Sequence, residues 1–87
     1  MPVIWIPALL REFTNGEERV AVPGYTVKQV IAELGARYPG MKARLFEGDQ
    51  LRPDIAIVVD GTLSNLRLRH PLSENSEVHL LSAIRGG

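Results

Sequence analysis

One amphipathic segment, residues 26–38, limits the fold of this chain more than any other feature. Thr26 is followed three residues later by Gln29, a capping box typical of a helix N-terminus. Apolar side chains then recur along one helical face, at Val27, Val30, Ile31, Leu34 and Tyr38. Pro39-Gly40 predicts the end of the helix. A sheet is the economical partner against which a single long helix of this kind buries its apolar face.

Short β-branched and aromatic runs on both sides of this helix predict the strands of that sheet. Before the helix, the turn pair Asn15-Gly16 and a longer link over residues 8–13 connect two runs into a β-hairpin. After it, residues 41–46 predict one or two further helical turns, and Asp60-Gly61 predicts a turn. The predicted strands cover residues 3–6, 19–22, 55–59, 66–69 and 78–81.

The resulting order is β-β-α-β-β-β, which predicts an α+β fold. We expect a mixed sheet of four or five strands with one main helix packed on one face. Joining a hairpin to later strands through one helix gives the β-grasp arrangement, although a split βαβ also fits this order. The 87 residues suffice for one domain. We expect the domain to span residues 1–81 and a flexible tail to span residues 82–87.

The composition excludes several classes of function. Ten basic and ten acidic residues give no net charge, whereas nucleic-acid binders usually carry a basic excess. The one local basic cluster, Arg67, Arg69 and His70, is expected to be a solvated strand face. The chain has no cysteine, which excludes disulfides, thiolate metal sites and cysteine nucleophiles. Its apolar runs are too short for a membrane span and its start lacks a signal-peptide pattern, so we expect a cytoplasmic protein.

No arrangement of residues indicates a catalytic or metal site. His70 and His79 are nine residues apart, the first in a predicted turn and the second in a predicted strand. Asp49 and Asp54 flank Arg52-Pro53 in a predicted loop, where solvated carboxylates are common. We therefore expect no metal, no bound cofactor and no enzymatic activity.

The carboxyl end, Ile84-Arg85-Gly86-Gly87, carries the strongest indication of function. The six residues after Leu81 can extend about 20 Å from the sheet. A free carboxylate is a poor electrophile, but a mixed anhydride with AMP activates it. Glycine has no Cβ, so it fits a narrow channel and leaves its carbonyl accessible. The pattern predicts that these four residues enter the active site of a partner and that Gly87 reacts there.

Several segments of the chain match one known family: Ile6-Pro7-Ala8-Leu9-Leu10-Arg11-Glu12, Gly24-Tyr25-Thr26-Val27, Val59-Asp60-Gly61, His70-Pro71-Leu72, Glu77-Val78 and Gly86-Gly87. Through these segments the chain resembles the MoaD/ThiS family of ubiquitin-like sulfur carriers, especially its MoaD-like and CysO-like members. The resemblance implies that an E1-like adenylyltransferase of the MoeB/ThiF type uses ATP to adenylate Gly87. A sulfur donor would then form a thiocarboxylate, and a biosynthetic enzyme of molybdopterin or cysteine and related sulfur metabolism would accept the sulfur.

Strand alternation predicts a docking patch for that partner beside the tail. The strand residues expected to face the helix are Ile4, Ile6, Val20, Val22, Ile57, Val59, Val78 and Leu80. Trp5, His79 and Leu81 then face away from it. Together with Leu63 they would form an exposed apolar surface. The alternative is that Trp5 packs beneath residues 41–46.

Two other functions remain open at this point. Arg85 before the diglycine resembles ubiquitin, so Gly87 could instead be joined to lysines of other proteins, as in a protein modifier. Alternatively, the β-grasp domain is an interaction module with an inert tail.

Overall fold

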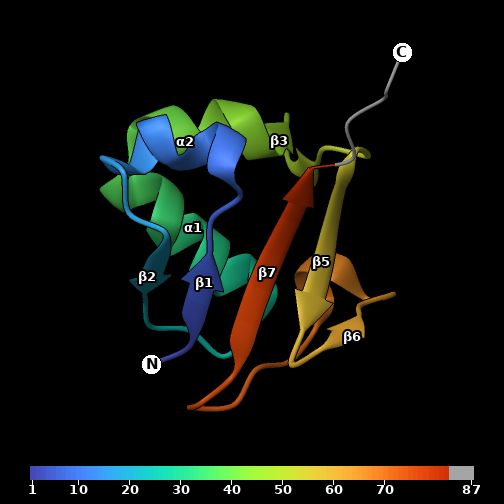
Figure 1. The fold of residues 1–87 in the computed structure, drawn as a ribbon. Helices are drawn as coiled ribbons and strands as arrows, with labels where there is room; N and C mark the ends of the chain where they lie inside the picture. Colours follow the sequence, from blue (N-terminus) through green and yellow to red (C-terminus); the bar gives the residue numbers. More distant parts are fainter. Residues whose placement is uncertain (83–87) are drawn as a thin grey trace.

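A mixed five-stranded sheet, with strand order β2-β1-β7-β5-β6, forms one layer of the fold (Figure 1). The computed structural model describes residues 1–82. The central strand β7 pairs in parallel with β1 and antiparallel with β5, and the two outer pairs are antiparallel. The strands are β1 (Val3–Trp5), β2 (Arg19–Ala21), β5 (Ile55–Val59), β6 (Thr62–Leu63) and β7 (Glu77–Ser82).

This topology confirms the ubiquitin-like β-grasp fold with five strands. The parallel strands β1 and β7 are direct neighbours in the sheet. In a split βαβ, another strand would separate them, so that alternative is wrong.

The main helix, α1 (Val27–Arg37), begins where the sequence predicts. The Thr26 hydroxyl accepts a hydrogen bond from the Gln29 backbone N–H at 3.2 Å. The Gln29 side chain in turn accepts one from the Tyr25 backbone N–H at 2.7 Å. The helix lies across one face of the sheet (Figure 1) and buries Val27, Val30, Ile31 and Leu34.

A second helix follows at once. Pro39-Gly40 does end α1, but Pro39 also starts α2 (Pro39–Leu45), because proline suits the first turn of a helix. The helix buries Met41 and Leu45, which confirms the predicted further turns. A short hairpin that the sequence did not predict comes next, with β3 (Phe46–Glu47) paired to β4 (Gln50–Leu51).

The core lies between the helices and one face of the sheet. The strand residues predicted to face the helix are all buried there: Ile4, Ile6, Val20, Val22, Ile57, Val59, Val78 and Leu80. The alternate residues of β1, β5 and β7 therefore lie on the opposite face, which no helix covers in Figure 1. No helix within residues 1–82 has the length and apolar character needed to cross a membrane.

Two segments between the strands are 3-10 helices. The first, η1 (Ala8–Thr14), forms the long link of the first hairpin. The second, η2 (Arg67–Arg69), replaces the strand predicted over residues 66–69, so that prediction was wrong.

Tertiary hydrogen bonds explain this difference. The Arg67 guanidinium donates to the backbone carbonyls of Ile55 at 2.7 Å and Arg52 at 2.9 Å. The Arg67 backbone N–H donates to the Ser64 hydroxyl at 3.0 Å, and its φ of 52° is left-handed. A strand has no residue in this conformation.

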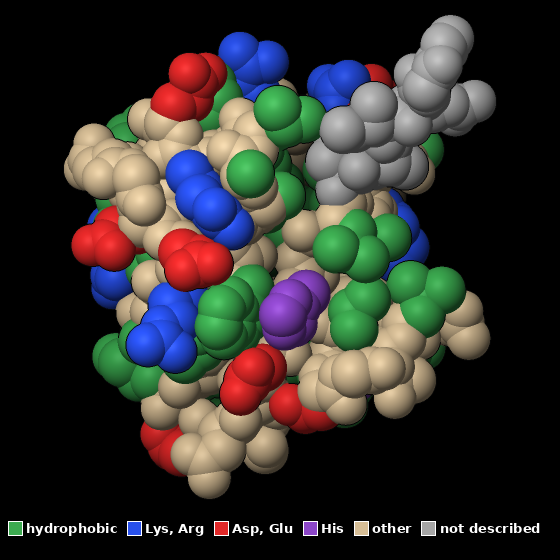
Figure 2. All heavy atoms as spheres, in the orientation of Figure 1, with side chains coloured by type: hydrophobic (Ala, Val, Ile, Leu, Met, Phe, Trp, Pro, Cys, Tyr) green, Lys and Arg blue, Asp and Glu red, His purple; other side chains and the backbone are tan. Residues whose placement is uncertain are grey.

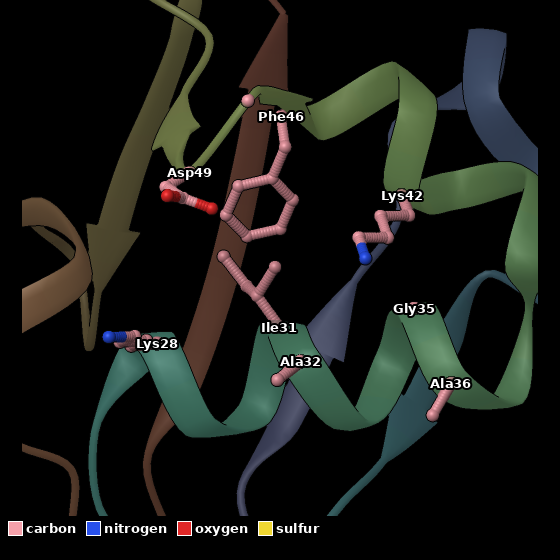
Figure 3. Close-up of a pocket in the computed structure, with 9 residues that line it drawn as sticks. Lys28, Ile31, Ala32, Gly35, Ala36, Lys42, Phe46 and Asp49 are labelled. Atoms are coloured by element: carbon pink, nitrogen blue, oxygen red, sulfur yellow. The ribbon is translucent and has the colours of Figure 1, made fainter.

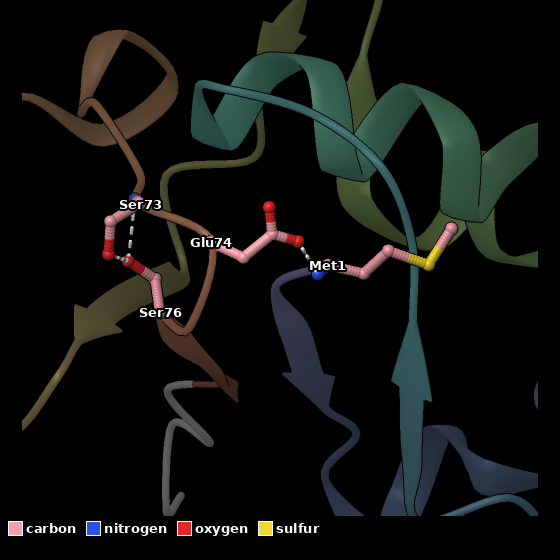
Figure 4. Close-up of polar contacts among 4 residues, drawn as sticks. All are labelled: Met1, Ser73, Glu74 and Ser76. Carbon is pink, nitrogen blue, oxygen red and sulfur yellow. Dashed lines mark hydrogen bonds and ion pairs between the residues drawn. The ribbon is translucent and has the colours of Figure 1, made fainter.

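The turn before β7 is hydrogen-bonded to the N-terminal residue of the chain (Figure 4). The Ser73 backbone N–H donates to the Ser76 hydroxyl at 2.9 Å, which closes the turn over residues 73–76. The Met1 ammonium group donates a hydrogen bond to the Glu74 carboxylate. This hydrogen bond, assisted by the positive charge, lowers the pKa of the Glu74 carboxyl below its ordinary value of 4.5.

Candidate docking surface and carboxyl end

Trp5 lies on the uncovered face of the sheet and is held there by three neighbours. Its ring stacks on His79, with ring centroids 5.2 Å apart and planes within 4°. Its Nε1–H donates to a Glu77 carboxylate oxygen at 3.1 Å. The Arg19 guanidinium lies over the ring, 5.4 Å from its centroid. Since these contacts are all to strands β2 and β7, the alternative that Trp5 packs beneath residues 41–46 was wrong.

The strand register places further apolar side chains in line with Trp5. Trp5 is opposite His79, His79 is opposite Val58, and Val58 is opposite Leu63. Leu81 lies two residues beyond His79 on the same face of β7. We call this surface the open-face patch, which comprises Trp5, Val58, Leu63, His79 and Leu81.

The open-face patch is only partly covered by the protein itself. Leu63 is 60% exposed and Leu81 48% exposed, whereas Trp5, Val58 and His79 are half-buried. Figure 2 shows hydrophobic side chains on both sides of a histidine on this face. Adjacent exposed apolar side chains with an aromatic ring among them are typical of a protein-binding surface. The structure thus brings together all three residues predicted for docking, and their docking role stays a prediction.

The patch continues to the end of the described chain. Leu81 is followed by Ser82, the last residue of β7, which pairs with Ile55. The predicted tail residues Ile84, Arg85, Gly86 and Gly87 lie outside the described residues. Six extended residues span at most about 20 Å, which limits how far Gly87 can lie from Leu81.

The histidines and aspartates occupy separate structural environments. His70 Nδ1 shares a hydrogen bond of 2.7 Å with the Ser64 hydroxyl, whereas His79 stacks on Trp5. Asp54 forms an ion pair with Arg52 at 3.5 Å, and Asp49 lies exposed between β3 and β4. Within residues 1–82, no three side chains of metal-binding type lie close enough together to hold a metal ion.

The basic cluster differs from the predicted solvated strand face. Arg69 is exposed, but Arg67 is half-buried and its guanidinium binds backbone carbonyls. The segment is a 3-10 helix and not a strand. That prediction was therefore wrong for Arg67, whose charge stabilises the start of β5.

Sequence reasoning missed the neighbours that orient Trp5. Arg19 lies directly opposite Trp5 in the β1–β2 register, and Glu77 comes two residues before His79. The alternation within β2 and β7 assigns Arg19 and Glu77 to a face of the sheet. It places them beside Trp5 only when the pairing of the strands is known. Val58 was missed for the same reason.

Comparison with known proteins identifies a family model and several solved structures that the chain resembles. The model described as ThiS family matches residues 4–87. A search of curated proteins found no match.

Among solved structures, the chain resembles one from the Amycolatopsis orientalis BexX/CysO complex, with 29% identity, a TM-score of 0.92 and full coverage of both chains. It also resembles Mycobacterium tuberculosis CysO, with 27% identity and a TM-score of 0.86, over 97% of this chain and 100% of that one. Small archaeal modifier protein 1 from Methanosarcina acetivorans has 27% identity and a TM-score of 0.87, over 99% of this chain and 95% of that one.

Proposed function

Because the chain belongs to the ThiS family of ubiquitin-like sulfur carriers, which are carriers and not enzymes, we propose that Gly87 is its sulfur-carrying residue. In this proposal an E1-like adenylyltransferase of the MoeB/ThiF type uses ATP to join AMP to the Gly87 carboxylate. A sulfide donor then displaces AMP and leaves a thiocarboxylate. A biosynthetic enzyme of molybdopterin, cysteine or related sulfur metabolism accepts the sulfur.

The chemistry of the tail supports this role. AMP removes the negative charge from the reacting carboxyl group and provides a good leaving group. Gly86 and Gly87 have no Cβ, so the channel of the partner can be narrow around them and the carbonyl carbon stays open to attack by sulfur. Ile84 and Arg85 precede the glycines and would lie at the entrance of the channel.

The position of the open-face patch is the observation that carries the proposal. Fixing residues 83–87 in a channel costs about 5–10 kcal/mol of backbone entropy, at about 1–2 kcal/mol per residue. Glycines bring little apolar surface to offset this cost. The folded body must supply the remaining affinity, and Leu81 places apolar surface one residue before the end of β7. We therefore propose Trp5, Leu63 and Leu81 as contacts of the activating enzyme.

One relative supports the proposal of a protein partner. The structure from Amycolatopsis orientalis is that of a BexX/CysO complex, and the present chain matches one chain of that structure over its whole length. A chain of this shape thus binds another protein in that organism.

Intact-mass measurement tests the proposal. The purified chain is incubated with its activating enzyme, ATP and a sulfide source, and a variant ending at Arg85 serves as the control. The expected result is a mass gain equal to one sulfur minus one oxygen, located at Gly87 by fragmentation and not found in the control. The proposal fails if the full chain gains no sulfur with any donor.

A second candidate function is that of a protein modifier. It is favoured by the likeness to small archaeal modifier protein 1. Activation of Gly87 would be the same, but a lysine amine would attack the adenylate in place of sulfide. Denaturing gels of cells that express a tagged copy separate the two functions: a ladder of heavier species supports the modifier, and a single band supports the carrier alone.

A further inference from the structure

A groove lies on the helical side of the molecule, away from the open-face patch (Figure 3). Its volume is about 510 Å³. Helix α1 forms its floor, and α2 and the β3–β4 hairpin form its wall. The groove is lined by Lys28, Ile31, Ala32, Gly35, Ala36, Lys42, Phe46, Gly48 and Asp49.

The floor of the groove is low because its residues are small. Ala32, Gly35 and Ala36 share the exposed side of α1. A Cβ added at Gly35 would lie 3.5 Å from Lys42 Cβ, so the stem of Lys42 lies directly over this glycine. The half-buried ring of Phe46 provides an apolar wall. An extended peptide backbone with small side chains fits such a surface.

The two lysines of the chain both line this groove. All eight other cationic side chains are arginines, so Lys28 and Lys42 are its only side-chain amines. Both lysines are exposed. In Figure 3 the Lys42 amine points into the groove, whereas the Lys28 amine points away from it.

We propose that this groove is an acceptor site for the carboxyl-terminal segment of a second copy of the chain, and that Lys42 forms an isopeptide bond with Gly87 of that copy. The inference rests on the activation of Gly87 in the proposed function. It deepens the modifier candidate by naming an acceptor amine.

The sequence of the carboxyl end complements the groove. Ile84 matches the apolar wall at Phe46. Arg85 is opposite in charge to Asp49, which lines the groove. The two glycines suit the low floor formed by α1.

The bond-forming step is an ordinary acyl transfer. The neutral Lys42 amine attacks the carbonyl carbon of Gly87 and forms the C–N bond. The bond between that carbon and the phosphate oxygen breaks, and AMP leaves with the electron pair. The amine proton goes to solvent. ATP, through the activating enzyme, supplies the energy, and no oxidant or reductant takes part.

A test that does not depend on the activating enzyme uses the full chain prepared with a thioester at Gly87. Here the thiolate takes the place of AMP as the leaving group. Trypsin cleaves after Arg85, so each conjugated amine keeps a Gly86-Gly87 remnant that mass spectrometry locates. The expected remnant is on Lys42. Lys42→Arg should reduce conjugation about tenfold, because a docked amine reacts far faster than a free one.

A second pair of variants tests the groove itself with both lysines kept. Ala32→Glu places an anionic side chain on the floor and should reduce conjugation at Lys42, whereas Ala43→Glu changes an exposed residue of α2 that does not line the groove and should not. Equal labelling of Lys42, Lys28 and the Met1 amine would overturn the inference, as would equal effects of the two glutamate variants. If Gly87 gains sulfur but its thioester does not label Lys42, the acceptor site fails while the carrier function stands.

Discussion

Shortening two leucines of the open-face patch should weaken binding of the chain to its activating enzyme. Leu63 is 60% exposed and Leu81 48% exposed, so about half of each side chain is available to a partner. Complete burial of a leucine side chain is worth about 1.5–3 kcal/mol, and alanine keeps part of that gain. Leu63→Ala and Leu81→Ala together should therefore cost about 1–2 kcal/mol of binding, which raises Kd about 5- to 30-fold.

A control pair with matched exposure makes this prediction specific. Leu9 is 64% exposed and Leu66 46% exposed, but neither belongs to the open-face patch. Leu9→Ala with Leu66→Ala removes similar exposed apolar area from η1 and the segment before η2. Kd for the activating enzyme is measured by calorimetry, and urea unfolding confirms that all variants remain folded. The reasoning is refuted if the two pairs weaken binding equally, or if the patch pair leaves Kd within twofold of the original value.

Three further predictions concern the fold that presents the patch. Arg67→Ala removes two hydrogen bonds to carbonyls and should lower the free energy of unfolding by about 2–4 kcal/mol. Arg67→Gly should lose about 1 kcal/mol less, because glycine accepts the φ of 52° without strain; equal losses in urea unfolding would contradict this. Gly24→Ala should lower stability by about 1–3 kcal/mol, since its Cβ would lie 2.8 Å from Val30 Cγ1 at a φ of 153°; an unchanged Tm would show the reasoning to be wrong. The Met1 ammonium group lowers the pKa of Glu74, so their interaction stabilises the fold above pH 4.5 and is lost as pH falls through the lowered pKa. Glu74→Gln should therefore make stability less sensitive to acid below pH 4.5, and an unchanged pH profile would count against this ion pair.

The parts of the fold that local sequence determines were predictable. Thr26 and Gln29 set the start of α1 because a capping box needs only neighbouring residues. The alternation in β1, β5 and β7 assigned the inner and outer faces of the sheet, and with them Trp5 and Leu81. The candidate docking residues therefore followed from sequence once a helix was assigned to one face.

The remaining features depend on contacts between distant segments. Arg67 takes a left-handed backbone conformation because its guanidinium reaches carbonyls more than ten residues away, which no local propensity encodes. The β3–β4 hairpin has two residues per strand, too few for a periodic pattern. The groove with Lys42 arises only when α1, α2 and this hairpin are packed together. Residues 83–87 lie outside the described structure, so the role of Gly87 comes from chemistry and family membership.

The central claim is that the carboxyl end of the chain is the segment that reacts and that the folded domain provides the surface that the partner binds. Replacing the gene with a version that ends at Arg85 tests this claim, with growth of the cells under conditions that require the gene as the measurement. The account predicts that the shortened protein keeps its Tm and fails to support growth, as completely as deletion of the gene. Growth equal to that with the full chain would contradict the account and favour an interaction module whose tail is inert.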